Sequence, residues 1–132
     1  MITFTEKRCF SQQQLQELFK SVNWLSADYP ERLYKALNNC ETVFTAWDNN
    51  ILVGLINAID DSELTAYVHY LLVRPEYQNN GIGKELLRLV REKYNDYLYV
   101  ELIAESQELI EYYKKNGFNN VQGVYVMGIM NK

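Results

Sequence analysis

The sequence of 132 residues is poor in the residues that build disulfide frameworks and zinc sites. It contains two cysteines, Cys9 and Cys40, and a single histidine, His69. Two cysteines without a recurring spacing do not make a disulfide framework, and one histidine leaves too few ligands for a zinc site. We therefore expect two reduced thiols and no bound metal.

The chain also lacks long apolar runs and an excess of positive charge. No apolar run approaches the roughly 20 residues that cross a bilayer, and residues 1–10 contain no apolar signal segment, so we expect a cytoplasmic protein without membrane contact. The net charge is −4, with no basic stripe, which argues against nucleic-acid binding and favours cationic partners such as amines. Without linkers, repeats or low-complexity runs, residues 1–132 are expected to form a single domain.

The hydrophobic periodicity predicts alternating helices and strands. Ser11 is a suitable cap for a first helix, and Pro30 suits the first turn of a second one. The expected helices cover residues 12–21, 30–37, 82–94 and 107–116, and the expected strands cover 2–4, 42–47, 51–59, 65–73, 97–103 and 121–130.

The segment from Val73 to Leu87 is the most informative part of the chain. A strand ends before Pro75, a turn with Gly81 and Gly83 follows, and a helix begins with an apolar stripe at 82, 86, 90 and 94. Such a turn directs backbone N–H groups outward at the positive end of the helix dipole, where a phosphate group binds favourably. A P-loop is excluded because Glu85 follows Lys84, where Ser or Thr is needed. A dinucleotide fingerprint would need a third glycine.

The pattern Gln-x-x-Gly-x-Gly, from Gln78 to Gly83, resembles the pyrophosphate-binding signature of the GCN5-related N-acetyltransferase (GNAT) superfamily. A second segment, from Glu101 to Phe118, is similar to the later part of that family and ends in Tyr-Tyr-x-x-x-Gly-Phe. Gly117 suits the left-handed position after a helix, from which Phe118 can fold back onto Tyr113. The resemblance covers about residues 42–130. It implies an α/β fold with a central twisted mixed sheet and helices on both faces.

The same resemblance implies that acetyl-CoA is the cosubstrate. Its pyrophosphate would lie on the glycine turn, and its pantetheine arm would run along the end of the strand 65–73. The N–H of Leu71 would polarise the acetyl carbonyl, and Ser106 stands where many relatives have an asparagine that contacts the arm. The implied coenzyme-binding residues are Leu71, Leu72, Val73, Gln78, Asn79, Asn80, Gly81, Ile82, Gly83, Lys84, Ser106 and Tyr113.

The family's general acid, which protonates the departing thiolate, corresponds to Tyr113. The alternative is that Tyr113 belongs to an apolar stripe with Leu109 and Ile110 and only packs.

The attacking amine must also lose a proton, and His69 is the first candidate base. Simple strand alternation would place His69 on one face with Tyr67 and Leu71. In the first alternative, His69 is a structural residue and Glu101 acts as the base through a water molecule. In the second alternative, the substrate is an aromatic amine, which needs no base.

Trp24, Tyr29 and Tyr67 are weaker candidates for contact with the acceptor, because aromatic residues beside helices more often pack in the core. The function expected from the resemblance is acetyl transfer to a primary amine of a small molecule by direct attack in a ternary complex. The alternatives are a protein lysine or N-terminal acetyltransferase, a coenzyme-binding sensor without turnover, and a structural domain with an accidental glycine turn. The apolar segment 121–130 would allow a homodimer.

Overall fold

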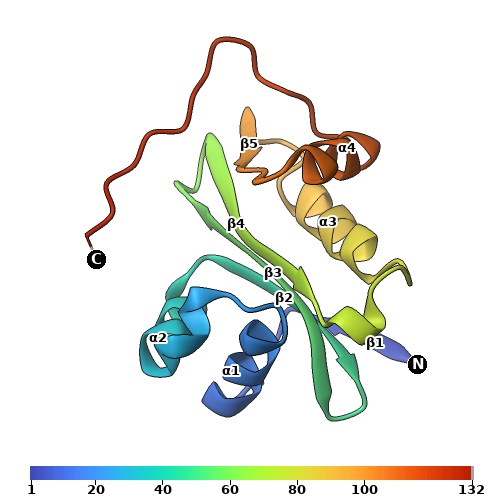
Figure 1. Cartoon of the computed structure of the whole chain (residues 1–132). Coiled ribbons are helices and arrows are strands. Elements are labelled where there is room, and N and C mark those ends of the chain that lie inside the picture. Colours follow the sequence, from blue (N-terminus) through green and yellow to red (C-terminus); the bar gives the residue numbers. More distant parts are fainter. Residues whose placement is uncertain (132) are drawn as a thin grey trace. The chain divides into compact units, whose positions relative to one another are not determined.

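The computed structural model describes residues 1–131 and divides them into two compact units (Figure 1). The first unit is Met1–Leu102, and the second begins at Ile103. The first unit contains β1 (Ile2–Thr5), α1 (Gln12–Ser21), the 3₁₀ helix η1 (Leu25–Asp28), α2 (Pro30–Asn39), β2 (Thr42–Asp48), β3 (Ile51–Asp60), β4 (Thr65–Val73), the 3₁₀ helix η2 (Pro75–Tyr77), α3 (Ile82–Lys93) and β5 (Tyr99–Leu102). The second unit contains α4 (Gln107–Lys115).

Within residues 1–131, the strands form one five-stranded sheet in the order β1-β2-β3-β4-β5. The first four strands pair antiparallel, and β5 lies parallel to β4. The parallel pair is possible because α3 carries the chain back across the sheet between the two strands. The expected mixed sheet in an α/β fold is therefore confirmed.

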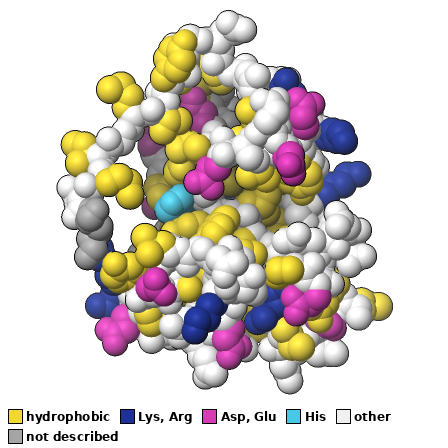
Figure 2. Space-filling model, viewed as in Figure 1, with side chains coloured by type: hydrophobic (Ala, Val, Ile, Leu, Met, Phe, Trp, Pro, Cys, Tyr) yellow, Lys and Arg dark blue, Asp and Glu magenta, His cyan; other side chains and the backbone are white. Residues whose placement is uncertain are grey.

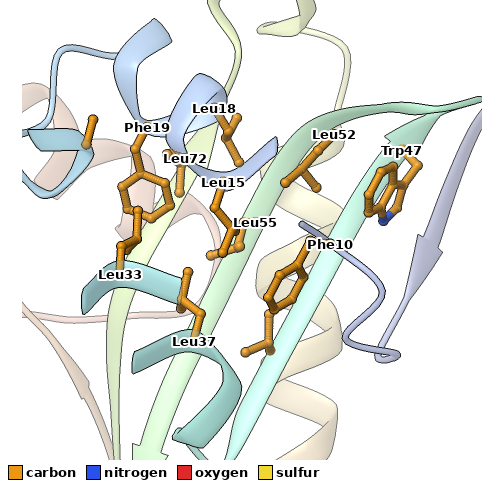
Figure 3. Close-up of a cluster of buried hydrophobic side chains, with 12 residues drawn as sticks. Phe10, Leu15, Leu18, Phe19, Leu33, Leu37, Trp47, Leu52, Leu55 and Leu72 are labelled. Carbon is orange, nitrogen blue, oxygen red and sulfur yellow. The ribbon is translucent and has the colours of Figure 1, made fainter. Parts of the chain in front are cut away.

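One face of the sheet is covered by α1 and α2 (Figure 3). The first of these helices begins at Ser11, whose side chain and that of Gln14 form a capping box. Leu15, Leu18 and Phe19 of α1 are completely buried. They pack with leucines and aromatic residues from α2, β2, β3 and β4. The amphipathic pattern of the sequence thus builds this layer, because each apolar stripe finds the same face of the sheet.

The other face of the sheet is covered by α3, so helices lie on both faces as expected (Figure 1). The predicted stripe of α3 is fully buried and consists of Ile82, Leu86, Val90 and Tyr94. Gly54 on β3 allows this close approach, since an added Cβ would lie 3.1 Å from Ile82 Cγ2 and 3.4 Å from Leu86 Cδ1. The helix that starts at the glycine turn is therefore fixed directly on the sheet.

Two expected strands differ from the structure. The fifth strand is shorter than expected, covering Tyr99–Leu102, because Tyr97 still belongs to the turn after α3 and donates its N–H to the Tyr94 carbonyl at 3.1 Å. The expected strand at 121–130 is wrong: no strand is formed among the described residues of this segment. Its apolar side chains are exposed, Tyr125 by 86% and Met127 by 92%. A strand needs a hydrogen-bonded partner, which β propensity alone does not supply.

Candidate active site

The glycine turn before α3 has the conformation that an anion-binding loop requires. Asn79 and Gly81 both have positive φ angles, of 67° and 82°. Gly81 is the N-cap of α3. Because glycine has no side chain, the N-cap residue supplies no side-chain acceptor to the first N–H groups of the helix. An added Cβ at Gly81 would meet no atom within 4 Å, which leaves open space in front of the turn. Backbone N–H groups and the helix dipole together make this position suitable for a phosphate.

The turn is tied to the end of β4 by polar contacts. Gln78 donates from Nε2 to the Val73 carbonyl at 3.0 Å. Arg74 donates its backbone N–H to the Val53 carbonyl and its Nε to the Leu52 carbonyl, both at 2.8 Å. These bonds hold the exit of β4 against β3, so the position of the turn is set by the sheet and not by the loop alone.

The backbone of β4 directs two N–H groups away from β3. Tyr70 and Arg74 both donate their N–H groups toward β3, to the Asn57 side chain at 2.9 Å and to the Val53 carbonyl at 2.8 Å. Since successive N–H groups of a strand alternate in direction, Leu71 and Val73 direct theirs to the opposite side. The pairing with β5 covers only Thr65–Val68 of β4, so this part of the strand lies beyond the paired region.

A β-bulge interrupts β4 at its centre. Ile56 pairs with Leu71 and Ala58 pairs with Val68, so Asn57 on β3 faces two residues of β4, His69 and Tyr70. The expected alternation from His69 to Leu71 is therefore wrong, because the extra residue shifts the side-chain order at this point. Instead, His69 lies beside the rings of Tyr67 and Tyr70, at 5.7 Å and 4.0 Å.

The imidazole of His69 stacks on the ring of Tyr70 with an interplanar angle of 21°. One face of the imidazole is thereby removed from water, while the side chain stays exposed at the molecular surface (Figure 2). This partial desolvation lowers the pKa of His69 below its ordinary value of 6.5. The imidazole is then neutral at pH 7, which is the state that can accept a proton.

The other candidates of the first unit lie on different elements. Glu101 is exposed on β5 and is the register partner of Tyr67 on β4. Trp24 packs against Phe19 and Tyr70, with ring centroids at 5.8 Å and 5.5 Å. Tyr29, at the start of α2, has the guanidinium of Arg32 5.7 Å from its ring centroid. Among these side chains, the structure brings Trp24 and His69 onto the same ring, that of Tyr70.

In the second unit, Tyr113 lies in the last turn of α4, and the helix ends as its sequence predicts. Gly117 has a φ angle of 97°, and Phe118 donates its N–H to the Tyr113 carbonyl at 3.0 Å. The rings of Tyr113 and Phe118 lie edge to face at 5.9 Å. Burial raises the pKa of Tyr113 to about 12, with smaller contributions from Tyr112 and Glu105. Ser106 caps the same helix, accepting from the Leu109 N–H at 3.1 Å.

The sequence profile described as "Acetyltransferase (GNAT) family" matches residues 9–118. The chain belongs to the GNAT family. Its fold agrees with this assignment: a GNAT-family acetyltransferase of Streptococcus pneumoniae TIGR4 superposes with a TM-score of 0.86, at 25% identity and with complete coverage of both chains.

Two curated relatives with N-acetyltransferase names cover less of the sequence. An uncharacterized N-acetyltransferase, ycf52, of Gracilaria tenuistipitata var. liui is 25% identical over 120 residues, covering 84% of this chain and 65% of the relative. The chloroplastic GCN5-related N-acetyltransferase 2 of Arabidopsis thaliana is 38% identical over 69 residues, covering 51% of this chain and 26% of the relative. The chain thus spans between about a quarter and two-thirds of the length of these two relatives.

The described residues of this GNAT chain contain no cluster of three or more His, Cys, Asp or Glu side chains that could hold a metal ion. The helices of the described chain also include none that is both long and apolar enough to cross a membrane.

Sequence reasoning missed two residues beside His69, Asn57 and Tyr70. Asn57 is 3% exposed and accepts the Tyr70 N–H at the bulge. One signal was available: an asparagine in the middle of the apolar run from Ile51 to Ile59 demands a hydrogen-bond partner once that strand is buried.

Proposed function

We propose that this chain transfers an acetyl group from acetyl-CoA to a primary amine of a small molecule, by direct attack in a ternary complex. The observation that carries the proposal is the glycine turn at the start of α3, which follows the β4 segment whose Leu71 and Val73 N–H groups point away from β3. An anion site and a row of strand donors adjoin each other there, which suits a ligand with a pyrophosphate and an amide-containing arm.

The turn fits such a ligand on steric and electrostatic grounds. The space in front of Gly81 is open, and the N–H groups of Ile82, Gly83 and Lys84 begin a helix of 12 residues. Gln78 and Asn80 would help to hold the loop, since their side chains donate to the carbonyls of Val73 and Tyr77 at 3.0 Å and 3.3 Å. Acetyl-CoA, when bound, supplies the activated thioester.

The Leu71 N–H is proposed to donate to the acetyl carbonyl as negative charge develops on its oxygen. Removing one such donor typically costs about 3 kcal/mol of transition-state stabilisation. Because this donor is a backbone group next to the bulge, its direction depends on the pairing of β4 with β3.

His69 is proposed to take the proton from the attacking amine. A lysine-like amine with a pKa near 10.4 pays about 4.6 kcal/mol to be neutral at pH 7. An imidazole held neutral by partial burial can accept that proton directly or through a water molecule. Glu101, exposed on β5, is the second candidate for the same role.

Tyr113 is proposed to protonate the departing thiolate. With its pKa near 12, the phenol is fully protonated at neutral pH. Transfer to a thiolate of pKa near 8.5 would then be uphill by roughly 5 kcal/mol in the free protein. A proton donation late in the reaction, or a lower pKa in the ternary complex, is consistent with that cost.

The acceptor is proposed to be a small amine because a net charge of −4 attracts cations. The test is calorimetric titration of acetyl-CoA followed by measurement of thiol release with a panel of small amines and a flexible lysine-containing peptide. Micromolar coenzyme binding with turnover of a small amine supports the proposal. Preference for the peptide would favour protein acetylation, and binding without any turnover would favour a sensor. A folded protein that does not bind acetyl-CoA would refute the acetyltransferase function.

We further propose that the apolar segment 121–130 pairs with a second copy of the chain to form a homodimer. Val124, Tyr125, Val126 and Met127 are between 63% and 92% exposed, and a soluble protein seldom leaves such a run uncovered. Sedimentation velocity should show a dimer at micromolar concentration, and truncation after Asn120 should give a monomer. A monomeric full-length chain would refute this pairing.

A further inference from the structure

The bulge in β4 has a support that the regular sheet does not provide. Where Asn57 faces both His69 and Tyr70, the Tyr70 N–H donates to a side chain of the neighbouring strand, Asn57 Oδ1, at 2.9 Å. Asn57 is nearly completely buried, at 3% exposure, in a strand that is otherwise apolar between Leu52 and Ala58. A buried amide is costly unless its hydrogen bonds are satisfied, so its presence there calls for a specific role.

The other end of the Asn57 amide is also engaged. Nδ2 donates to Cys40 Sγ at 3.7 Å, and the Cys40 thiol contacts the carbonyls of Leu37 and Thr42 at 3.7 Å and 3.6 Å. Asn57 is therefore held from the α2–β2 connection on one side while it holds the bulge on the other.

The side chain of Tyr70 is fixed independently of its backbone. Its hydroxyl lies 2.7 Å from Ser26 Oγ in η1, and its ring meets Phe19 edge to face at 4.9 Å and Trp24 at 5.5 Å. Tyr70 is thus held at its backbone N–H, at its ring and at its hydroxyl. On this ring the imidazole of His69 stacks at 4.0 Å.

We propose that Asn57 and Ser26 are positioning residues that clamp Tyr70 at its backbone and at its hydroxyl, and that the clamped ring sets the orientation of the His69 imidazole. Asn57 acts through the bulge, which it stabilises by accepting the Tyr70 N–H with its side chain. Ser26 acts through the phenol. This inference rests on the proposed function for its catalytic meaning, because His69 is the candidate base there, but the clamp itself is a structural claim that needs no substrate.

The chain offers a direct probe because it has one histidine. In the free protein, the carbon-bound imidazole protons give one unambiguous set of NMR signals, and stacking on Tyr70 should displace them from their random-coil positions through the ring current. Asn57→Leu removes the acceptor at similar volume and should return these signals toward random coil, with faster amide exchange at Tyr70. Ser26→Ala should also move the His69 signals toward random coil, but by less, and should leave amide exchange at Tyr70 unchanged.

Two variants serve as matched controls. Cys40→Ala removes the thiol next to Asn57 Nδ2 but keeps the acceptor oxygen for Tyr70, so the His69 signals should stay in place. Asn57→Asp also keeps an acceptor oxygen for the Tyr70 N–H, so the His69 signals should keep their positions. Unchanged His69 signals in a folded Asn57→Leu protein would overturn the role of Asn57. If Asn57→Leu does not fold, the role of Asn57 is instead overturned by His69 signals that shift in Asn57→Asp. The role of the Ser26 hydroxyl is overturned by His69 signals that stay unchanged in Ser26→Ala.

Kinetics then separates the clamp from the proposed chemistry. With His69 as the base, Asn57→Leu should lower kcat by at least about tenfold, because misplacement of a catalytic group by about 1 Å can cost two orders of magnitude. The Kd for acetyl-CoA should change less than kcat, since the glycine turn proposed to hold the pyrophosphate is untouched and only the Leu71 N–H lies next to the bulge. Displaced NMR signals with unchanged kcat would support the clamp and refute His69 as the base.

Discussion

Substitution of Gly81 by alanine and by glutamate gives the sharpest test of the anion site. Gly81 has a φ angle of 82°, and an added Cβ would meet no atom within 4 Å. Both variants therefore have the same backbone strain, about 1–2 kcal/mol for a side chain in the left-handed region, with no added clash. We expect losses of stability in the two variants that agree to within about 1 kcal/mol, measured by urea denaturation, because the glutamate gains only a small interaction with the helix dipole.

The two variants should differ in coenzyme affinity chiefly through the negative charge of the glutamate, which is larger than alanine as well as charged. A unit charge 4 Å from another contributes about 1 kcal/mol in water, and a pyrophosphate carries at least two charges. Gly81→Glu should therefore bind acetyl-CoA about 2 kcal/mol, or roughly 30-fold, more weakly than Gly81→Ala. Calorimetry at low and high salt checks this, since screening should reduce the difference between the variants. Equal affinities in the two variants would show that no phosphate lies at the start of α3.

Three further predictions concern the proton-transfer groups and the helix that carries the turn. The rate with a basic amine should rise with pH through the pKa of His69, which lies below 6.5, and His69→Gln should abolish this rise. Because the pKa of His69 is lower in the folded state, the unfolded state binds a proton first as the pH falls below 6.5. The parent should therefore lose more stability than His69→Gln in that range. Tyr113→Phe should lower kcat by about 10²–10⁴-fold with unchanged acetyl-CoA affinity, and equal turnover in parent and variant would exclude Tyr113 as the acid. Leu86→Ala should destabilise the protein by about 2–5 kcal/mol in urea denaturation because Leu86 is completely buried between α3 and the sheet. Substitution of the exposed Arg88 by alanine should change stability by less than about 1 kcal/mol.

The parts of the molecule that the sequence predicted well are those encoded by neighbouring residues. The bounds of α1 and β4 match the expected ranges, and α3 begins at Ile82 as expected. The end of α4 also follows from a few adjacent residues, since Gly117 takes the left-handed conformation and Phe118 returns to Tyr113. Caps, turns and helical stripes need only local contacts, so the chain specifies them wherever they occur.

The features that depend on a partner strand could not be predicted in the same way. The bulge at His69 and Tyr70 is marked by no glycine, and its cause is the pairing with Asn57 on β3. The segment 121–130 has the composition of a strand but forms none among the described residues, because composition does not say which edge would pair with it. In both cases the sequence supplies a tendency, while the hydrogen-bonded partner decides the outcome.

This division between local and distant encoding has a functional consequence that can be measured. The glycine turn is specified by residues that follow one another in the chain, whereas the orientation of His69 is proposed to depend on Asn57 and Ser26, which lie on other elements. Gly81→Ala and Gly81→Glu should then change acetyl-CoA affinity without moving the His69 NMR signals. Asn57→Leu should move the His69 signals and have the smaller effect on acetyl-CoA affinity. Because the two sets of contacts share no residue, their effects on kcat/KM should add in Gly81→Ala combined with Asn57→Leu to within about 0.5 kcal/mol. A larger coupling energy would mean that the bulge also positions the turn through Leu71 and Val73.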